Sequence, residues 1–176
     1  MITLKDYQLR VLDSLRDFFR QCSTDGEPRA AFQRVQLLNS RQPVDYIPVY
    51  AAGLTPGMPY VCLRVPTGGG KTLLACYAAG LAMTELLHAE RSVVLWLVPS
   101  NTILDQTADA LRDPRHPYRR ALEMACGAVE VVTIEEALRL SHATVIGQTV
   151  VIVATIQAFR VEDTTGRKVY DQNSTF

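Results

Sequence analysis

The sequence RVPTGGGKTLLACYAAGLAM, at residues 64–83, places three consecutive glycines and a lysine between two apolar segments. Residues 60–65 form a short, β-rich apolar run that predicts a strand. Residues 71–88 have the apolar pattern of a helix. A glycine-rich turn between a strand and a helix is the context that a phosphate-binding loop requires. We therefore expect a phosphate site at this junction.

The side chains and backbone of this loop suit a nucleotide. Without Cβ atoms, Gly68, Gly69 and Gly70 let several backbone N–H groups converge on one phosphate. The helix that begins near Lys71 adds its partial positive end, and the lysine can reach the β- and γ-phosphates. The Thr72 hydroxyl suits one coordination position of Mg²⁺, so Lys71 and Thr72 are the candidate catalytic residues. The predicted loop consists of Pro66, Thr67, Gly68, Gly69, Gly70, Lys71 and Thr72.

The loop departs at one position from the general pattern G-x-x-x-x-G-K-[ST]. Counting back from Gly70, the first glycine of that pattern falls on Val65. The alternative interpretation is a glycine-rich turn that happens to precede a lysine. The position of G-K-T between an expected strand and an expected helix argues against it.

The remaining chain predicts an α/β fold. Apolar residues recur at three- and four-residue steps from Leu4 to Phe19, which indicates an amphipathic helix. Residues 23–59 hold five prolines and three glycines and predict a loop-rich insertion with a short helix at 30–38. Strand and helix patterns then alternate, which favours a parallel sheet with helices on both faces. The other expected strands span 92–98, 129–133 and 149–154, and the other expected helices span 102–112 and 134–140. The strands 93–98 and 150–153 are almost continuously apolar and are expected to be covered on both faces.

The composition bounds the class of protein. A length of 176 residues with 48% hydrophobic residues is enough for one domain with a sizeable core. The 18 basic and 18 acidic residues cancel, so a nucleic-acid contact has to come from a local surface. The four cysteines lack C-x-x-C spacing and predict buried free thiols in a reducing compartment. The sequence shows neither a signal peptide nor an apolar run of membrane-spanning length, so we expect a cytoplasmic protein without membrane contact.

Four segments together resemble a known family. VPTGGGKT, at residues 65–72, resembles the P-T-G-x-G-K-T loop of superfamily 2 DEAD/DEAH-type helicases and translocases, in which the first glycine is commonly replaced. LKDYQ at 4–8 resembles the upstream Q-type motif, LWLVPSNTILDQT at 95–107 resembles motif Ia, and VIVATIQAF at 151–159 resembles the strand-ending Thr motif. The tyrosine-glutamine start and VATIQAF are most similar to the helicase part of type III restriction enzyme Res subunits. The resemblance runs from Leu4 to about Phe159, excluding the insertion.

The resemblance implies a fold and a function. It implies a P-loop NTPase (RecA-like) three-layer αβα sandwich with a mainly parallel sheet, incomplete at the C-terminal side. It implies ATP and Mg²⁺ as cofactors and an ATP-dependent helicase or translocase as the activity. DNA is the expected nucleic acid, in preference to RNA. A second RecA-like domain and a modification or specificity subunit are the expected protein partners.

Gln8 is the candidate adenine-reading residue of the Q-type motif. Its side-chain amide offers one donor group and one acceptor, which can pair with adenine N6 and N7 together and would favour ATP over GTP. An exposed helix glutamine without a ligand is the alternative.

Polar residues at the ends of two expected strands are the candidate nucleic-acid contacts. They are Ser100, Asn101, Thr102, Thr155 and Gln157. The carboxyl edge of an open parallel sheet is where ligands bind, and hydroxyl, amide and free N–H groups suit a nucleic-acid backbone. Simple helix capping is the alternative for these residues.

Helicases of this group carry an Asp-Glu pair after a further strand, which holds Mg²⁺ and orients the attacking water. Glu135-Glu136 opens a helix instead, and Glu162-Asp163 lies in a polar tail. We therefore expect residues 1–176 to be a single truncated amino-terminal ATP-binding domain, with the insertion at 23–59 and the polar tail at 160–176 preceding the absent strand. An arginine finger from the second domain contributes about 10³ to 10⁵ in rate in related enzymes, so we expect this chain to bind ATP–Mg²⁺ and to hydrolyse ATP poorly.

Two other functions are compatible with the loop. One is a standalone P-loop module that binds a nucleotide without motor activity. The other is a small-molecule or nucleoside kinase, which would want arginines facing the loop. Arg115, Arg119 and Arg120 form the only such cluster, and a solvated helix face accounts for them.

Overall fold

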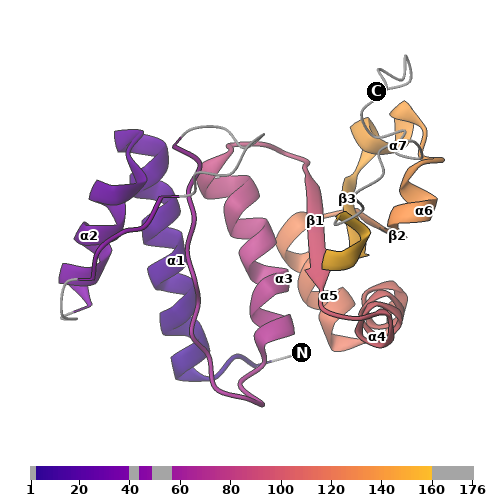
Figure 1. The fold of residues 1–176 in the computed structure, drawn as a ribbon, viewed down its shortest axis with the longest axis horizontal. Helices are drawn as coiled ribbons and strands as arrows, with labels where there is room; N and C mark the ends of the chain where they lie inside the picture. The colour runs from indigo at the N-terminus through magenta and orange to yellow at the C-terminus, as the bar shows by residue number, and fades with distance from the viewer. Residues whose placement is uncertain (1–2, 40–43, 49–56, 160–176) are drawn as a thin grey trace. The chain divides into compact units, whose positions relative to one another are not determined.

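The computed structural model describes residues 3–39, 44–48 and 57–159 (Figure 1). The chain divides into two compact units, Met1–Ala89 and Glu90–Phe176. Each unit has its own packed elements, so each is described by itself. Within the described residues, no helix combines the length and the apolar character needed to cross a membrane.

Unit 1 begins with two helices joined by a tight turn. Helix α1 spans Asp6–Asp25, and its buried side chains follow helical spacing. It ends at Gly26, which has a φ of 67° and donates its N–H to the Cys22 carbonyl. Helix α2 spans Pro28–Leu38 and begins with a proline, which suits the first helical position. Both predicted helices are confirmed, and residues 23–25 of the expected insertion belong to α1.

The core of unit 1 forms where α1 and α2 meet. Its buried members are Leu15, Phe18, Cys22, Ala31 and Tyr46. The Phe32 ring bridges the core, because its centroid lies 6.5 Å from that of Phe18 and 5.5 Å from that of Tyr46. Burial of each large apolar side chain contributes about 1.5–3 kcal/mol to stability. Ala78 and Leu81 pack on this cluster from helix α3, which spans Lys71–Leu81.

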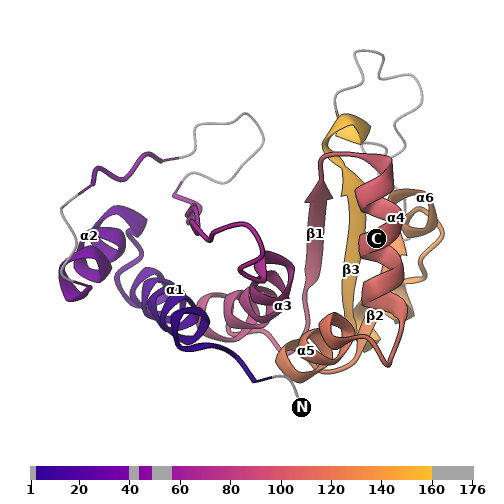
Figure 2. The same cartoon turned by 90° about the horizontal axis from the view of Figure 1, so that it is seen from below.

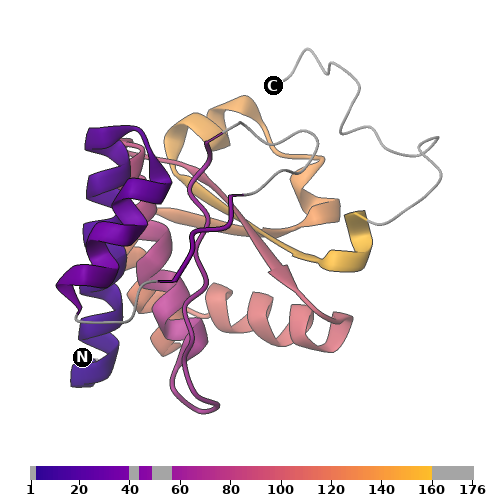
Figure 3. The ribbon, with the colours of Figure 1, turned by 60° about the vertical axis from the view of Figure 1, so that its left-hand side comes forward.

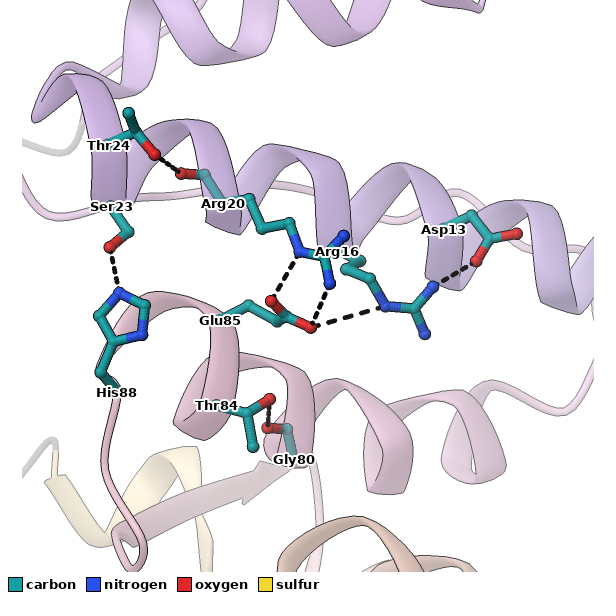
Figure 4. Close-up of polar contacts among 9 residues, drawn as sticks. All are labelled: Asp13, Arg16, Arg20, Ser23, Thr24, Gly80, Thr84, Glu85 and His88. Carbon is teal, nitrogen blue, oxygen red and sulfur yellow. Dashed lines mark hydrogen bonds and ion pairs between the residues drawn. The ribbon is translucent and has the colours of Figure 1, made fainter.

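The helix that follows the glycine loop is shorter than predicted. Regular α3 is followed by a π-helix, η1, at Ala82–Leu86, and His88 adopts a left-handed φ of 48°. Within this wider turn, the Glu85 carboxylate pairs with Arg20 at 2.7 Å and with Arg16 at 3.7 Å on α1 (Figure 4). The hydrogen bond from Arg20 lowers the pKa of Glu85. Ser23 Oγ lies 2.6 Å from His88 Nε2 just beyond, so α1 contacts this end of the helix twice (Figure 4).

The predicted strand at residues 60–65 is wrong. This segment has no strand assignment and no ladder partner in the described residues. The Tyr60 N–H donates to the Tyr46 hydroxyl at 3.0 Å, and Val61 packs on the core of unit 1. Val61 is half-buried on this core, whereas Tyr60, Cys62 and Leu63 are exposed. An apolar run predicts a strand only where a neighbouring edge is available for pairing.

Unit 2 contains a parallel sheet. Strand β1 spans Val93–Val98, β2 spans Val129–Thr133 and β3 spans Thr149–Thr155, in the order β1-β3-β2. All pairs are parallel, and β1 lies beside β3 along its length (Figure 2). Helix α4, at Asn101–Arg112, covers one face, and α6 and α7, at Ile134–Ala137 and His142–Gly147, cover the other (Figure 3). Three predicted strands and the open α/β fold are confirmed.

Coverage of the sheet differs from strand to strand. Val150, Val151, Val153 and Ala154 of β3 are all fully buried, as its continuous apolar sequence predicts. In β1, by contrast, the side chains of Val93, Leu95 and Leu97 are 54%, 48% and 46% exposed. Within unit 2, the helices cover only one face of β1, so cover on both faces is not confirmed there. An apolar run does not by itself distinguish a central strand from an edge strand.

Two helices of unit 2 were not predicted. Helix α5 spans Pro117–Cys126, and the His116 ring accepts a hydrogen bond from Tyr118 N–H at its start. Helix α7 is capped by Ser141, whose hydroxyl accepts from Thr144 N–H. A proline at the first helical position and a serine cap are sequence signals that could have located both helices.

Arg119 on α5 is a structural residue. Only 16% of its side chain is exposed, and it pairs with Glu123 at 2.7 Å. Its guanidinium also donates to the carbonyls of Leu111 and Val129, at 3.3 and 2.8 Å. The solvated-face interpretation is therefore wrong for Arg119, whereas Arg115 is 89% exposed. Arg119 joins the end of α4 and the start of β2 to α5.

We predict that Arg119→Met lowers the free energy of unfolding of unit 2 by about 1–3 kcal/mol, because two carbonyls lose their donor. Urea unfolding followed by the fluorescence of Trp96, the single tryptophan, measures this change. Arg115→Met is the matched control, because this exposed arginine is expected to change stability by less than about 0.5 kcal/mol. Equal effects of the two substitutions would contradict the assignment.

The cysteines differ in exposure. The prediction of buried thiols is confirmed for Cys22, Cys76 and Cys126 and is wrong for Cys62, which is exposed. Burial raises the pKa of the Cys22 and Cys126 thiols to about 11, so both stay protonated at neutral pH. Reactivity toward thiol reagents is therefore expected at Cys62, which lies just before the glycine loop.

Candidate nucleotide and nucleic-acid sites

The glycine loop is a tight turn that leads into α3. Gly68 and Gly70 have left-handed φ values of 75° and 78°, which favour glycine. The Gly69 N–H donates to the Pro66 carbonyl at 2.9 Å and closes the turn. Gly70 is the residue before α3, and its carbonyl accepts from Leu74 N–H at 3.0 Å. The loop thus ends at the amino end of an 11-residue helix.

The loop leaves no room for side chains at two of its glycines. A Cβ on Gly69 would lie 2.5 Å from Val65 Cγ1 and 2.9 Å from the Pro66 carbonyl oxygen. A Cβ on Gly70 would lie 2.6 Å from Gln8 Nε2. Around Gly68 nothing lies within 4 Å of such an atom. Backbone atoms of the loop are therefore packed against Val65 on one side and Gln8 on the other, which fits a cradle built from backbone groups.

Gln8 lies against the loop. Its side-chain Nε2 donates to the Gly69 carbonyl at 3.0 Å, and its Oε1 accepts from Lys5 N–H at 2.9 Å. Gln8 is only 6% exposed, so the alternative of an exposed helix glutamine is wrong. An amide group has two N–H bonds and two oxygen lone pairs, so one donor and one acceptor position remain for a ligand.

Tyr7 makes a contact that was not predicted. Its hydroxyl donates to the Gly69 carbonyl at 2.9 Å, the same oxygen that Gln8 contacts. Tyr7 and Gln8 are consecutive, and both lie in the first turn of α1. The sequence signal was present, because a tyrosine directly precedes the glutamine of the Q-type segment. What the sequence could not show is the partner of the tyrosine.

The Lys71 ammonium bends back over its own loop. Nζ donates to the carbonyl oxygens of Val65 and Pro66, at 3.3 and 3.2 Å, and the residue is exposed. An ammonium group has three N–H donors, so one direction remains for an incoming anion. Thr72 lies next to it in the first turn of α3 and is half-buried. The side chains of Pro66 and Thr67 are exposed.

In unit 2, the candidate nucleic-acid residues lie at one edge of the sheet. Ser100 follows β1 and caps α4, because its hydroxyl accepts from Ile103 N–H at 3.4 Å. Asn101 and Thr102 are the first residues of α4, and both are exposed. Capping therefore accounts for Ser100, whereas it does not account for the other two side chains.

The end of β3 contributes to the same edge. Thr155 is opposite Val98 in the parallel register, so the chain leaves both strands at one side. Thr155 is only 8% exposed, and its hydroxyl accepts from Ala158 N–H at 3.3 Å, which makes it a turn residue. Gln157 is exposed in the short 3₁₀-helix η2 at Ile156–Phe159. Asn101, Thr102 and Gln157 are thus exposed at this edge, as is Ser100, whose hydroxyl caps α4.

Of the two acidic residues after β2, Glu136 has a structural role. Glu136 accepts from Thr133 N–H at 2.7 Å and pairs with Arg112. The backbone hydrogen bond from Thr133 and the Arg112 charge lower the pKa of Glu136. The other candidate pair, Glu162-Asp163, lies outside the described residues.

A family model for the type III restriction enzyme res subunit matches residues 1–175, which includes the glycine loop and both strand-end segments. The chain belongs to this family. The family is of the ATP-dependent helicase type, in agreement with the open parallel sheet of unit 2 and a RecA-like α/β fold. Searches of curated proteins and of solved structures gave no significant match.

We predict that Gly69→Ala destabilises the loop, whereas Gly147→Ala does not. The added methyl group would overlap Val65 and a backbone oxygen, at an expected cost of about 1–3 kcal/mol. Gly147→Ala is the control, because a Cβ there meets nothing within 4 Å. Hydrogen exchange of peptides covering residues 66–72 measures the effect. Unchanged exchange in Gly69→Ala would contradict the loop geometry.

Proposed function

We propose that this chain binds ATP–Mg²⁺ at the glycine loop and DNA at the carboxyl edge of the unit 2 sheet, as part of an ATP-dependent helicase or translocase of a type III restriction system. The single observation that carries the nucleotide assignment is the contact between Gln8 and the Gly69 carbonyl. It brings the proposed adenine-reading side chain to the proposed phosphate cradle.

The phosphate contacts are assigned to the loop and to the start of α3. Backbone N–H groups of residues 67, 68 and 70–72, the amino end of the helix and the Lys71 ammonium are all positive in character, whereas the Gly69 N–H donates to Pro66. In this proposal, one Lys71 N–H turns to the phosphates while the contacts to Val65 and Pro66 hold the side chain over the loop. Lys71 would stabilise the negative charge that develops on the transferred phosphoryl group.

The remaining groups orient the nucleotide. The Thr72 hydroxyl is the candidate Mg²⁺ ligand, since hard cations prefer oxygen and the residue adjoins Lys71. The Mg²⁺ ion would neutralise charge between neighbouring phosphates. Gln8 retains one N–H and one oxygen lone pair for the adenine edge, which would favour ATP over GTP. Pro66 and Thr67 complete the proposed contact set.

The DNA contacts are assigned to the edge where β1 and β3 end. Asn101, Thr102 and Gln157 offer exposed amide and hydroxyl groups, and the first N–H groups of the 12-residue α4 point toward the same edge. Such groups bind sugar and phosphate without reading the bases. In the proposal, Ser100 and Thr155 hold the backbone in shape for these contacts through their caps.

Hydrolysis by this chain is proposed to be slow. A water molecule that attacks the γ-phosphate needs a carboxylate or amide to orient it. Among the described residues, the carboxylate pair that follows a strand is Glu135-Glu136, and Glu136 is held by Thr133 and Arg112. Purified chain is therefore expected to bind ATP and to release phosphate at a rate close to that of a no-enzyme control.

We predict that Lys71→Ala weakens binding of a fluorescent ATP analogue by about tenfold or more in the presence of Mg²⁺, because a charge-assisted hydrogen bond is lost. A fluorescence titration of the 176-residue chain measures the affinity. Arg29→Ala is the control, because it removes an exposed positive charge on α2. Equal affinities of wild type and Lys71→Ala would exclude the phosphate-loop assignment.

We predict that the double variant Asn101→Ala, Thr102→Ala binds a labelled single-stranded DNA several-fold more weakly than wild type, because two exposed polar contacts are lost. Fluorescence anisotropy at fixed salt measures the affinity, and an RNA of the same sequence tests the preference for DNA. Gln106→Ala, an exposed change further along α4, is the control. A DNA affinity that the double variant leaves unchanged speaks against this edge as the DNA site.

A further inference from the structure

The Gly69 carbonyl oxygen accepts two hydrogen bonds from one turn of α1. The Tyr7 hydroxyl lies at 2.9 Å and Gln8 Nε2 at 3.0 Å. A carbonyl oxygen has two lone pairs, so these two donors occupy its usual capacity. Gly69 is buried at this contact. The first turn of α1 therefore fixes where this oxygen points.

Fixing the oxygen also fixes the next amide. The described peptide bonds are all trans, and in a trans peptide the carbonyl and the following N–H point in opposite directions. Because the Gly69 oxygen points toward α1, the Gly70 N–H points away from α1. Both residues are glycines, and Gly70 has a φ of 78°, so the backbone alone allows other orientations of this peptide at little cost. The donors on α1 select one of them.

The two donors are not equivalent. Gln8 also accepts from Lys5 N–H, and in the proposed function it faces the adenine edge. The Tyr7 hydroxyl has a single assigned contact among the described residues, the Gly69 carbonyl. Tyr7 thus holds the peptide whatever hydrogen bonds Gln8 makes.

We propose that Tyr7 is a positioning residue of the nucleotide site. Its hydroxyl holds the Gly69–Gly70 peptide so that the Gly70 N–H stays aimed at the phosphates. This inference rests on the proposed nucleotide function and adds a residue that acts through the loop, without touching the nucleotide. It implies that Tyr7 affects affinity for the phosphate chain itself, whether or not adenine is attached.

The test is Tyr7→Phe, which keeps the ring and removes only the hydroxyl. We expect the affinity for the fluorescent ATP analogue to fall about three- to tenfold, as for the loss of one hydrogen bond. Tripolyphosphate, which lacks adenine, is expected to compete about three- to tenfold less well as well. Tyr77→Phe on α3 is the matched control, because it removes a tyrosine hydroxyl from the same unit.

A second readout does not need a nucleotide. The backbone amide signal of Gly70 in a ¹⁵N NMR spectrum is expected to shift or double in Tyr7→Phe and to stay in place in Tyr77→Phe. Unchanged Gly70 signals together with wild-type affinity for tripolyphosphate would overturn the inference. A weaker affinity for the ATP analogue alone, with tripolyphosphate unaffected, would assign Tyr7 to adenine and also overturn it.

The outcomes separate the inference from the proposed function. If wild type and Lys71→Ala bind the analogue equally, the nucleotide site itself is wrong, and the inference falls with it. If Lys71→Ala binds more weakly while Tyr7→Phe matches wild type, the nucleotide site stands and the role of Tyr7 is wrong. Weaker binding by both variants, with Tyr77→Phe unaffected, supports both.

Discussion

The hydrogen bonds that α1 makes to the Gly69 carbonyl are the constraint on which the candidate nucleotide site depends. Glycines give a phosphate cradle its open backbone, and the same property leaves that backbone without a preferred shape. The shape then has to come from outside the loop. Here the loop's shape comes from its hydrogen bonds to Tyr7 and Gln8. Val65 packs where a Cβ of Gly69 would lie, and Gln8 packs where a Cβ of Gly70 would lie, so larger residues are excluded.

Much of the fold could be predicted from periodicity, because helices α1 to α4 and the three strands each carry a local apolar pattern. The strand predicted at residues 60–65 is wrong, because strand formation depends on hydrogen bonding to a neighbouring strand, which the local sequence does not reveal. The apolar sequence of β1 likewise does not show that, within unit 2, one of its faces is left exposed. Helix α5 follows a histidine cap and opens with polar residues, so its local apolar pattern is weak.

The candidate site was predicted better in its residues than in its contacts. The loop and Gln8 were located from residue type and order, and the structure brings them together. The burial of Gln8 and the contact of Tyr7 depend on how α1 packs, which residue spacing does not predict. The Lys71 contacts lie within the loop itself. For Arg119, the residue type alone was misleading. A charged residue in a polar stretch predicts a solvent-exposed side chain, but the Arg119 side chain is mostly buried and its guanidinium donates hydrogen bonds to two carbonyls.

The ion pair of Glu85 with Arg16 and Arg20 has a mechanical consequence. Helix α3 is joined to α1 near its first residue through the glycine loop, and again beyond its last residue through η1. The 11 residues between correspond to a rod of about 16 Å. Helix α3 is therefore held against α1 beyond both of its ends, so that one partner helix contacts both the glycine loop and the π-turn.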